Sequence, residues 1–333
     1  MSTNGDVIVK LDDRARLLSA VLAATDYPEK TQKLKPHGTH AHARATRKFV
    51  AAHSQHAAVK ATQTMLDENT PLEALFAMVM LMDWPSLQIS TLPPFAPKNY
   101  NTLLLDFYKT AEIEKLWKQE KNAWDKTLSE AANVFKDVQF RKVFKPYLGE
   151  VTQELLFIPN ISYPSSYDVG FQIGEQLVCI APPPLAWGDS PPWPYDEATM
   201  VTHSYRAAMI IYGDTLLRNY LRTHAKELEE IVKIELPLTD QFKAQYPSWE
   251  EQFSTLFLSA VVAMYLEEHV DDREYKSYML MEKKARGLTN LPGTVSVMRR
   301  YLQEVGGDKY ENLIEFLPIF PKQLRVAQRI VTF

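Results

Sequence analysis

One histidine at the start of a predicted helix marks the place where this chain has residues typical of metal chemistry. The segment Met200 to Ala207 reads M-V-T-H-S-Y-R-A and follows a loop rich in proline. A zinc site of the H-E-x-x-H type places two His ligands one helical turn apart, with a Glu between them as general base. Here His203 is present, but Ser204 stands at the position of the Glu and Ala207 at that of the second His. The segment therefore predicts a degenerate metal site, which lacks the general base and the second His ligand.

Zinc-dependent hydrolysis needs more groups than this segment supplies. Catalytic zinc requires about three protein ligands and a water molecule, and loss of the general base alone costs roughly 10²–10⁴ in rate. The hydroxyl of Ser204 does not replace a carboxylate, because it has no useful pKa near neutrality without a neighbouring base. We therefore expect no zinc hydrolysis, no metal and no cofactor. Three interpretations of His203 stay open: a packed side chain bonded to a backbone carbonyl, a ligand-binding residue in the old cleft, and a metal ligand in a rebuilt site.

An aromatic loop precedes the His203 segment. Residues Ala181 to Tyr195 read A-P-P-P-L-A-W-G-D-S-P-P-W-P-Y, and the missing backbone donors exclude a helix or a central strand. Trp187, Trp193 and Tyr195 are the candidate binding residues here, together with His203. Such a loop could line a groove that binds an extended peptide by strand addition and aromatic contact. The alternative is a structural lid that packs on the core.

The elements that must position these residues are mostly helices. Glycine is scarce, with 11 residues, whereas Leu, Ala, Glu and Lys are frequent, and this balance favours helices. Apolar residues at helical spacing predict the following segments. Before the loop these are 11–26, 40–53, 57–66, 71–82, 101–110 and 111–144. After it they are 197–213, 215–233, 248–269, 271–286, 294–305 and 311–330.

Short apolar segments between these two groups of helices predict a small sheet. Glu154 to Pro159, Tyr167 to Ile173 and Gln176 to Ile180 are bounded by Pro, Gly, Asn and Ser. We therefore predict an α+β fold that is mostly α-helical. Its N-terminal helical part covers residues 1–148, and a part with the sheet and the C-terminal helices covers 149–333. No segment has the composition of a flexible linker, so the two parts are expected to form one compact unit.

Composition narrows the possible partners. The chain has 333 residues, 46% of them hydrophobic, and a net charge of −4, which does not indicate a nucleic-acid partner. No apolar stretch approaches the ~20 residues that span a bilayer, and the N-terminus lacks the pattern of a signal peptide. A single cysteine, Cys179, excludes an intramolecular disulfide. We expect a soluble cytoplasmic protein.

Several segments, in this order and spacing, resemble a poorly characterised group of bacterial zincin-like proteins related to the Glu-type metallopeptidases. The segments that carry the resemblance are Val9 to Ala23, Phe49 to Lys60, Glu154 to Ile180, Met281 to Leu288 and Tyr310 to Pro318. The resemblance extends over nearly the whole chain. It implies a zincin-like core, in which a small sheet lies beside the helix that carries the site.

The resemblance also implies a third ligand position on a later helix. Relatives with a complete site carry an E-x-x-x-R-A pattern there, and Ser259 and Ala260 occupy its R-A positions by spacing. Thr255 then stands where the ligand Glu belongs. Glu251, one turn earlier, is the alternative if the register differs. Of the four functional positions, only His203 keeps its expected residue.

The sequence therefore predicts a catalytically inactive, zincin-like pseudopeptidase. It would bind a peptide or a protein through the former active-site cleft. Two alternatives stay open: a metal-dependent hydrolase with a rebuilt site, for instance with Glu251 and His203, and a helical interaction scaffold whose cleft is filled by side chains.

Overall fold

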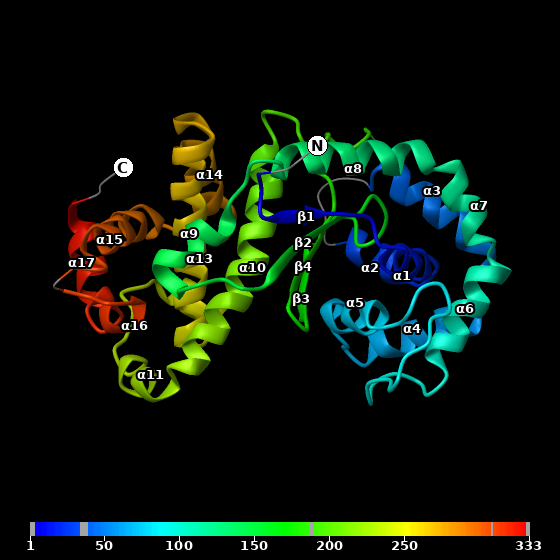
Figure 1. The fold of residues 1–333 in the computed structure, drawn as a ribbon, viewed down its shortest axis with the longest axis horizontal. Helices are drawn as coiled ribbons and strands as arrows, with labels where there is room; N and C mark the ends of the chain where they lie inside the picture. Colours follow the sequence, from blue (N-terminus) through cyan, green and yellow to red (C-terminus); the bar gives the residue numbers. More distant parts are fainter. Residues whose placement is uncertain (1–3, 34–38, 187–189, 308, 331–333) are drawn as a thin grey trace. The chain divides into compact units, whose positions relative to one another are not determined.

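The computed structural model describes residues 4–33, 39–186, 190–307 and 309–330. Its contacts form two compact units. Unit 1 comprises Met1–Val138 and Gln153–Ile211, and unit 2 comprises Gln139–Thr152 and Tyr212–Phe333. The sequence-based parts 1–148 and 149–333 therefore each contribute to both units. The predicted class is confirmed at the level of a mostly helical α+β chain with one small sheet (Figure 1).

The sheet belongs to unit 1 and is mixed. Its four strands are β1 (Val7–Val9), β2 (Glu154–Pro159), β3 (Val169–Ile173) and β4 (Gln176–Ala181), in the order β1-β2-β4-β3. β1, β2 and β4 are parallel, and β3 is the antiparallel edge strand. Three of the strands were predicted, with β3 beginning two residues later than expected. β2 is apolar along almost its whole length because it is buried on both faces.

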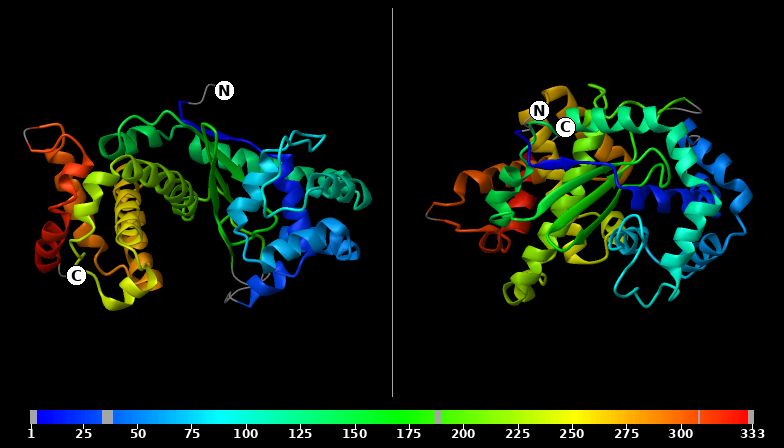
Figure 2. Two further views of the ribbon diagram at one scale, coloured as in Figure 1. Left: turned by 90° about the horizontal axis from the view of Figure 1, so that it is seen from below. Right: turned by 45° about the vertical axis from the view of Figure 1, so that its right-hand side comes forward.

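The sequence does not predict β1, because three residues carry too short an alternating pattern. Val7 pairs with Leu155 and Val9 with Phe157, so the strand is defined by a partner far away in the chain. In the right-hand view of Figure 2, the blue strand β1 runs alongside the green strands. Position in the sheet, rather than local pattern, makes this segment a strand.

Helices cover both faces of the sheet. α1 (Asp13–Ala24) and α5 (Leu72–Met80) share one core with apolar side chains of the first face. The sheet residues in that core are Leu156, Ile158, Val169, Phe171, Val178 and Ile180. On the opposite face, the rings of Phe135 and Phe157 lie 4.6 Å apart, which places the end of α8 (Lys121–Phe135) against β2.

The first part of α10 (Val201–Thr223) also approaches this opposite face. A Cβ added at Gly170 in β3 would lie 2.4 Å from Cγ2 of Ile211, so the glycine permits the close contact. α10 contributes its first residues, up to Ile211, to unit 1 and its remainder to unit 2.

The remaining helices of unit 1 pack around α1, which is buried along most of its length. They are α2 (Tyr27–Gln32), α3 (Ala41–Val50), the 3₁₀ turn η1 (Ala51–His53), α4 (Ala57–Asp67), α6 (Tyr100–Thr110) and α7 (Ile113–Gln119).

The prediction of one long helix over 111–144 is wrong. The segment forms α7, α8 and α9 (Phe140–Leu148). Glu112 adopts a left-handed backbone conformation with φ of 48°, which separates α6 from α7. After α8, the carbonyls of Lys136 and Val138 accept hydrogen bonds from the backbone N–H groups of Gly5 and Asp6, each at 2.8 Å. Backbone pairing with the N-terminal segment replaces helical bonds at this point.

The regular elements among the described residues of unit 2 are helices, joined by turns and loops. Its elements besides α9 and the end of α10 are α11 (Ala225–Ile231), α12 (Asp240–Gln245), α13 (Trp249–His269), α14 (Asp272–Arg286), α15 (Leu291–Glu304), α16 (Leu313–Phe316) and α17 (Phe320–Ile330). α13 packs against α14 and α15 and is buried on nearly all sides. The described helices include none that is both long and apolar enough to cross a membrane.

Several helix boundaries in this part differ from the prediction. α10 begins at Val201 rather than at 197, the expected helix 215–233 is divided at His224 between α10 and α11, and α12 lies where no helix is predicted. The expected break between 213 and 215 is absent, and α10 continues through Gly213. A Cβ at this glycine would lie 2.5 Å from Cδ2 of Leu258 and 2.9 Å from Cε1 of Phe144, so the glycine serves close packing instead of ending the helix. The expected helix 311–330 is two helices, since α16 ends just before Pro318.

Candidate functional site

His203 lies in the first turn of α10, directly opposite the end of β4. Its Nε2 atom is 3.2 Å from the carbonyl oxygen of Pro182. Because a carbonyl only accepts, Nε2 carries a proton and donates it in this bond. Ser204 and Ala207 are completely buried, and the Ser204 hydroxyl donates to the carbonyl of Tyr195 at 3.4 Å. The positions that a zinc helix would direct at a metal are therefore packed into unit 1.

Charged groups near His203 come from two elements. Asp168, directly before β3, and Arg206 of α10 form an ion pair at 3.7 Å. Burial lowers the pKa of His203, and Arg206 acts in the same direction, while Asp168 and the Pro182 carbonyl oppose this only in part. His203 is consequently a neutral hydrogen-bond donor at neutral pH.

Cys179 is the residue of β4 that would be considered as a nucleophile. Its side chain is completely buried, and burial raises the pKa of the thiol well above its ordinary value. Asp168 adds to this shift and Arg206 opposes it. Since the thiolate is the nucleophilic form, the structure favours an inert thiol over a Cys–His pair.

A buried hydrogen-bond network lies at the carboxyl ends of β2 and β4. Ligands of parallel sheets usually bind outside these ends. Here the backbone N–H of Asn160 donates to the carbonyl of Ala181 at 3.0 Å, and its side-chain amide donates to the carbonyl of Tyr163 at 3.1 Å. The hydroxyl of Tyr195 donates to the same Ala181 carbonyl at 2.6 Å. Hydrogen-bonded groups of Asn160 and Tyr195 lie at this edge of the sheet.

The three candidate aromatic residues of the proline-rich loop have different surroundings. Tyr195 is completely buried in the network just described, so it offers no surface to a ligand in this structure. Trp193 is 42% exposed, and its backbone N–H donates to the carbonyl of Pro184 at 2.9 Å. Trp187 lies outside the described residues.

The two candidate third ligands lie on α13, in unit 2, whereas His203 belongs to unit 1. Glu251 is the third residue of a capping box. It accepts hydrogen bonds from the backbone N–H and the hydroxyl of Ser248, both at 2.9 Å, and the first of these is the main reason that its pKa is lowered. Thr255 is half-buried one turn further along. Within the described ranges, no group of three or more His, Cys, Asp and Glu residues has an arrangement suited to a metal ion.

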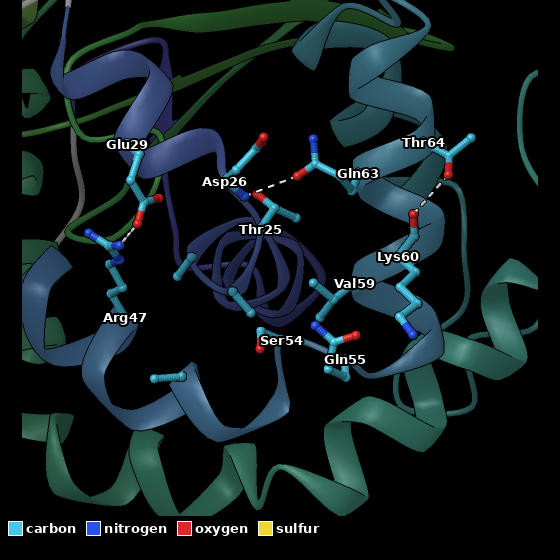
Figure 3. A pocket seen from close by; sticks show the side chains of 13 residues that line it. Thr25, Asp26, Glu29, Arg47, Ser54, Gln55, Val59, Lys60, Gln63 and Thr64 are labelled. Atoms are coloured by element: carbon cyan, nitrogen blue, oxygen red, sulfur yellow. Dashed lines mark hydrogen bonds and ion pairs between the residues drawn. The ribbon is translucent and has the colours of Figure 1, made fainter.

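A polar pocket of about 680 Å³ lies elsewhere in unit 1, and no motif in the sequence marks it. It is formed by the end of α1 and by residues of α2, α3, η1 and α4 (Figure 3). Small and apolar side chains, Ala23, Ala24, Ala51 and Val59, form part of its wall. The polar residues come from separate helices and are of types common on any surface, so their convergence could be found only in the folded chain.

The charges of the polar pocket are unevenly compensated. Glu29 and Arg47 form an ion pair, and the carboxylate of Asp26 pairs with Lys30 at 3.0 Å. Lys60, in contrast, forms no ion pair with any residue in the described part of the chain. Figure 3 shows the Glu29–Arg47 pair on one side of the pocket and Lys60 with Gln55 on the other. The pocket therefore offers one uncompensated cation beside an amide.

Comparisons with known proteins add no assignment. No protein-family model, no curated protein and no solved structure matches this chain. The likeness to zincin-like proteins is an expectation from the sequence pattern alone.

Proposed function

We propose that this chain is a degenerate zincin-like protein that binds a ligand and does not hydrolyse one. The observation that carries the proposal is the packing of the His203 face. Ser204 and Ala207 are buried, and the imidazole of His203 is bonded to a backbone carbonyl. Neither a hydroxyl nor a methyl group replaces a carboxylate base or a second imidazole. The chemistry of this donor set argues against zinc-dependent hydrolysis at His203.

Metal analysis of the purified protein tests the loss of zinc chemistry. After incubation with excess Zn²⁺ and gel filtration, we expect a metal content far below one equivalent per chain, because a single imidazole binds zinc too weakly. His203→Ala should leave this content unchanged. Stoichiometric zinc in the wild-type protein that is lost in His203→Ala would contradict the proposal and favour a rebuilt hydrolase site.

We place ligand binding at the polar pocket of unit 1. Its volume of about 680 Å³ is in the range of small-molecule sites. Lys60, Gln55 and Ser54 all line it and carry an ammonium, an amide and a hydroxyl, each of which can donate hydrogen bonds. A carboxylate matches these donors, because bonds to charged groups are the stronger ones. The proposed ligand is a small carboxylate or the carboxyl terminus of a peptide.

Calorimetric titration with two matched probes tests this assignment. N-acetyl-alanyl-alanine carries the free carboxylate, and its C-terminal amide lacks it, so the first should bind more tightly. Lys60→Gln should weaken binding of the carboxylate roughly three- to tenfold, since the lost interaction involves a charged donor. It should have little effect on the amide.

Lys48→Gln is the matched control. Lys48 is an exposed lysine of α3 that does not line the pocket, and its replacement removes the same charge. Equal affinity of the two probes, or equal effects of the two lysine substitutions, would refute a carboxylate site at Lys60.

A further inference from the structure

Unit 2 contains a second concave feature, which the proposed function does not use. It is an apolar slot of about 300 Å³ between α11, the turn that follows it, and α16. The apolar lining consists of Ile231, Ile234, Ile314 and Pro318. Ile231 and Ile314 are buried, whereas Ile234 is 39% exposed at the mouth. The slot is large enough to accept a bulky apolar side chain and leaves part of its own apolar surface in water.

Every charged residue that lines the apolar slot is acidic. Glu227 and Glu230 belong to α11, and Glu315 belongs to α16. Glu230 is paired with Lys233 at 2.5 Å. Neither Glu227 nor Glu315 forms an ion pair with a cation in the described residues of unit 2. Two uncompensated carboxylates therefore border an apolar site.

The two carboxylates act on the same half-buried group, the phenol of Tyr220. The hydroxyl of Tyr220 accepts a hydrogen bond from the backbone N–H of Ile314 at 3.0 Å. Burial is the main cause that raises the pKa of this phenol, and both Glu315 and Glu227 raise it further. Both negative charges therefore act on a hydroxyl that is hydrogen-bonded to Ile314, a residue that lines the slot.

We propose that the apolar slot binds a basic amphipathic segment of a partner protein, with an aliphatic side chain in the slot and flanking Lys or Arg residues at Glu227 and Glu315. Apolar contact supplies the anchor, because exposed apolar surface beside a pocket is stabilised when it is covered. Charge complementarity selects the partner, because an acidic flanking residue would be repelled by both carboxylates. This proposal is independent of the pocket in unit 1.

Fluorescence anisotropy with two labelled peptides tests the proposal. The basic probe is the amidated peptide K-L-K-K-L-L-K-K-L-K-K, and the acidic probe has Glu in place of each Lys. We expect the basic probe to bind and the acidic probe not to bind. The double substitution Glu227→Gln/Glu315→Gln should weaken binding of the basic probe at least about tenfold. The amide introduced by Glu315→Gln can still accept the backbone hydrogen bond that Glu315 receives from Glu311 at 2.8 Å, so the fold is preserved.

The matched control is the double substitution Glu229→Gln/Glu311→Gln. Both residues are exposed, neither lines the slot, and the change in net charge is the same. Ile234→Ser tests the apolar half and should also weaken binding. Equal affinity of the two double variants for the basic probe would show non-specific attraction to an acidic protein and overturn the proposal.

Sedimentation of the unliganded protein tests whether a second copy of the chain, instead of a partner protein, occupies the apolar slot. We expect a mass that does not depend on concentration in the micromolar range. If the wild type self-associates and Glu227→Gln/Glu315→Gln does not, then a second copy of the chain fills the slot, and the partner that we propose is wrong.

Discussion

His203 donates a hydrogen bond from Nε2 to the Pro182 carbonyl, so its imidazole has a structural partner in the backbone. Of the three interpretations that the sequence leaves open, the geometry agrees with a packed imidazole bonded to the backbone. At the same scale, Tyr195 proves to be a buried donor to Ala181, and Lys60, which no motif marks, becomes the uncompensated charge of a pocket. The type of each residue could be read from the sequence, but its partner could not.

The pKa of His203 predicts how stability depends on pH. Burial holds this pKa below that of an unfolded histidine, which is about 6.5. Between the two values the unfolded chain binds the proton and the folded chain does not, so stability rises with pH in this window. The contribution of His203 is complete above about pH 6.5 and declines as the pH falls toward the folded-state value.

We therefore expect His203→Gln to lose less stability than the wild type between pH 7.5 and pH 5.5. The glutamine amide can still donate to the Pro182 carbonyl but does not titrate. Urea unfolding at both pH values measures the difference in the free energy of unfolding. His269→Gln, at an exposed histidine, is the control and should behave like the wild type. Identical losses in wild type and His203→Gln would mean that His203 has the same pKa in the folded and unfolded chain.

At the scale of elements, local signals positioned most helices and three strands, because capping and apolar spacing act over a few residues. The capping box of Ser248 and Glu251 begins α13 where the sequence predicts it. Three of the failures share one cause. β1 needs β2 as a partner, the 111–144 segment is interrupted after α8 by the N-terminal segment, and α10 continues through Gly213, against which Leu258 and Phe144 pack closely. In each case a contact between distant residues outweighs the local preference.

The N-terminus of α4 offers a prediction at this scale. The Nδ1 atom of His56 accepts a hydrogen bond from the backbone N–H of Ala58 at 3.1 Å, and Nε2 lies 3.0 Å from a carboxylate oxygen of Asp106. His56→Ala removes the cap and should lower the free energy of unfolding by about 0.5–2 kcal/mol. It should also weaken ligand binding at the polar pocket, because Lys60 lies in the first turn of this helix.

His56→Asn separates capping from the other effects of the substitution. Asparagine is a good N-cap residue and should restore most of the stability that alanine loses, although it does not reach Asp106. Chemical denaturation of the three proteins gives the comparison. If asparagine destabilises the chain as much as alanine, then the contact with Asp106 or with the ring of Phe107 matters more than the cap.

At the scale of the whole molecule, the two units divide the functional features between them. Unit 1 holds the His203 region and the polar pocket, and unit 2 holds the apolar slot with its acidic border. Thr255 and Glu251, the expected partners of His203, belong to unit 2. Both concave sites are built from several helices, and each combines a charge without a partner with small or apolar walls. We propose binding at two surfaces, one in each unit.

The sequence by itself determined the predominance of helix, three of the four strands and the absence of the second imidazole and the carboxylate beside His203. These properties depend on residue type and short-range spacing. The tertiary structure decided that β1 joins the sheet, that Tyr195 closes the carboxyl edge, and that Lys60, Glu227 and Glu315 border concave sites. Burial and the pairing of charges depend on residues far apart in the chain, and only the packed molecule brings these together.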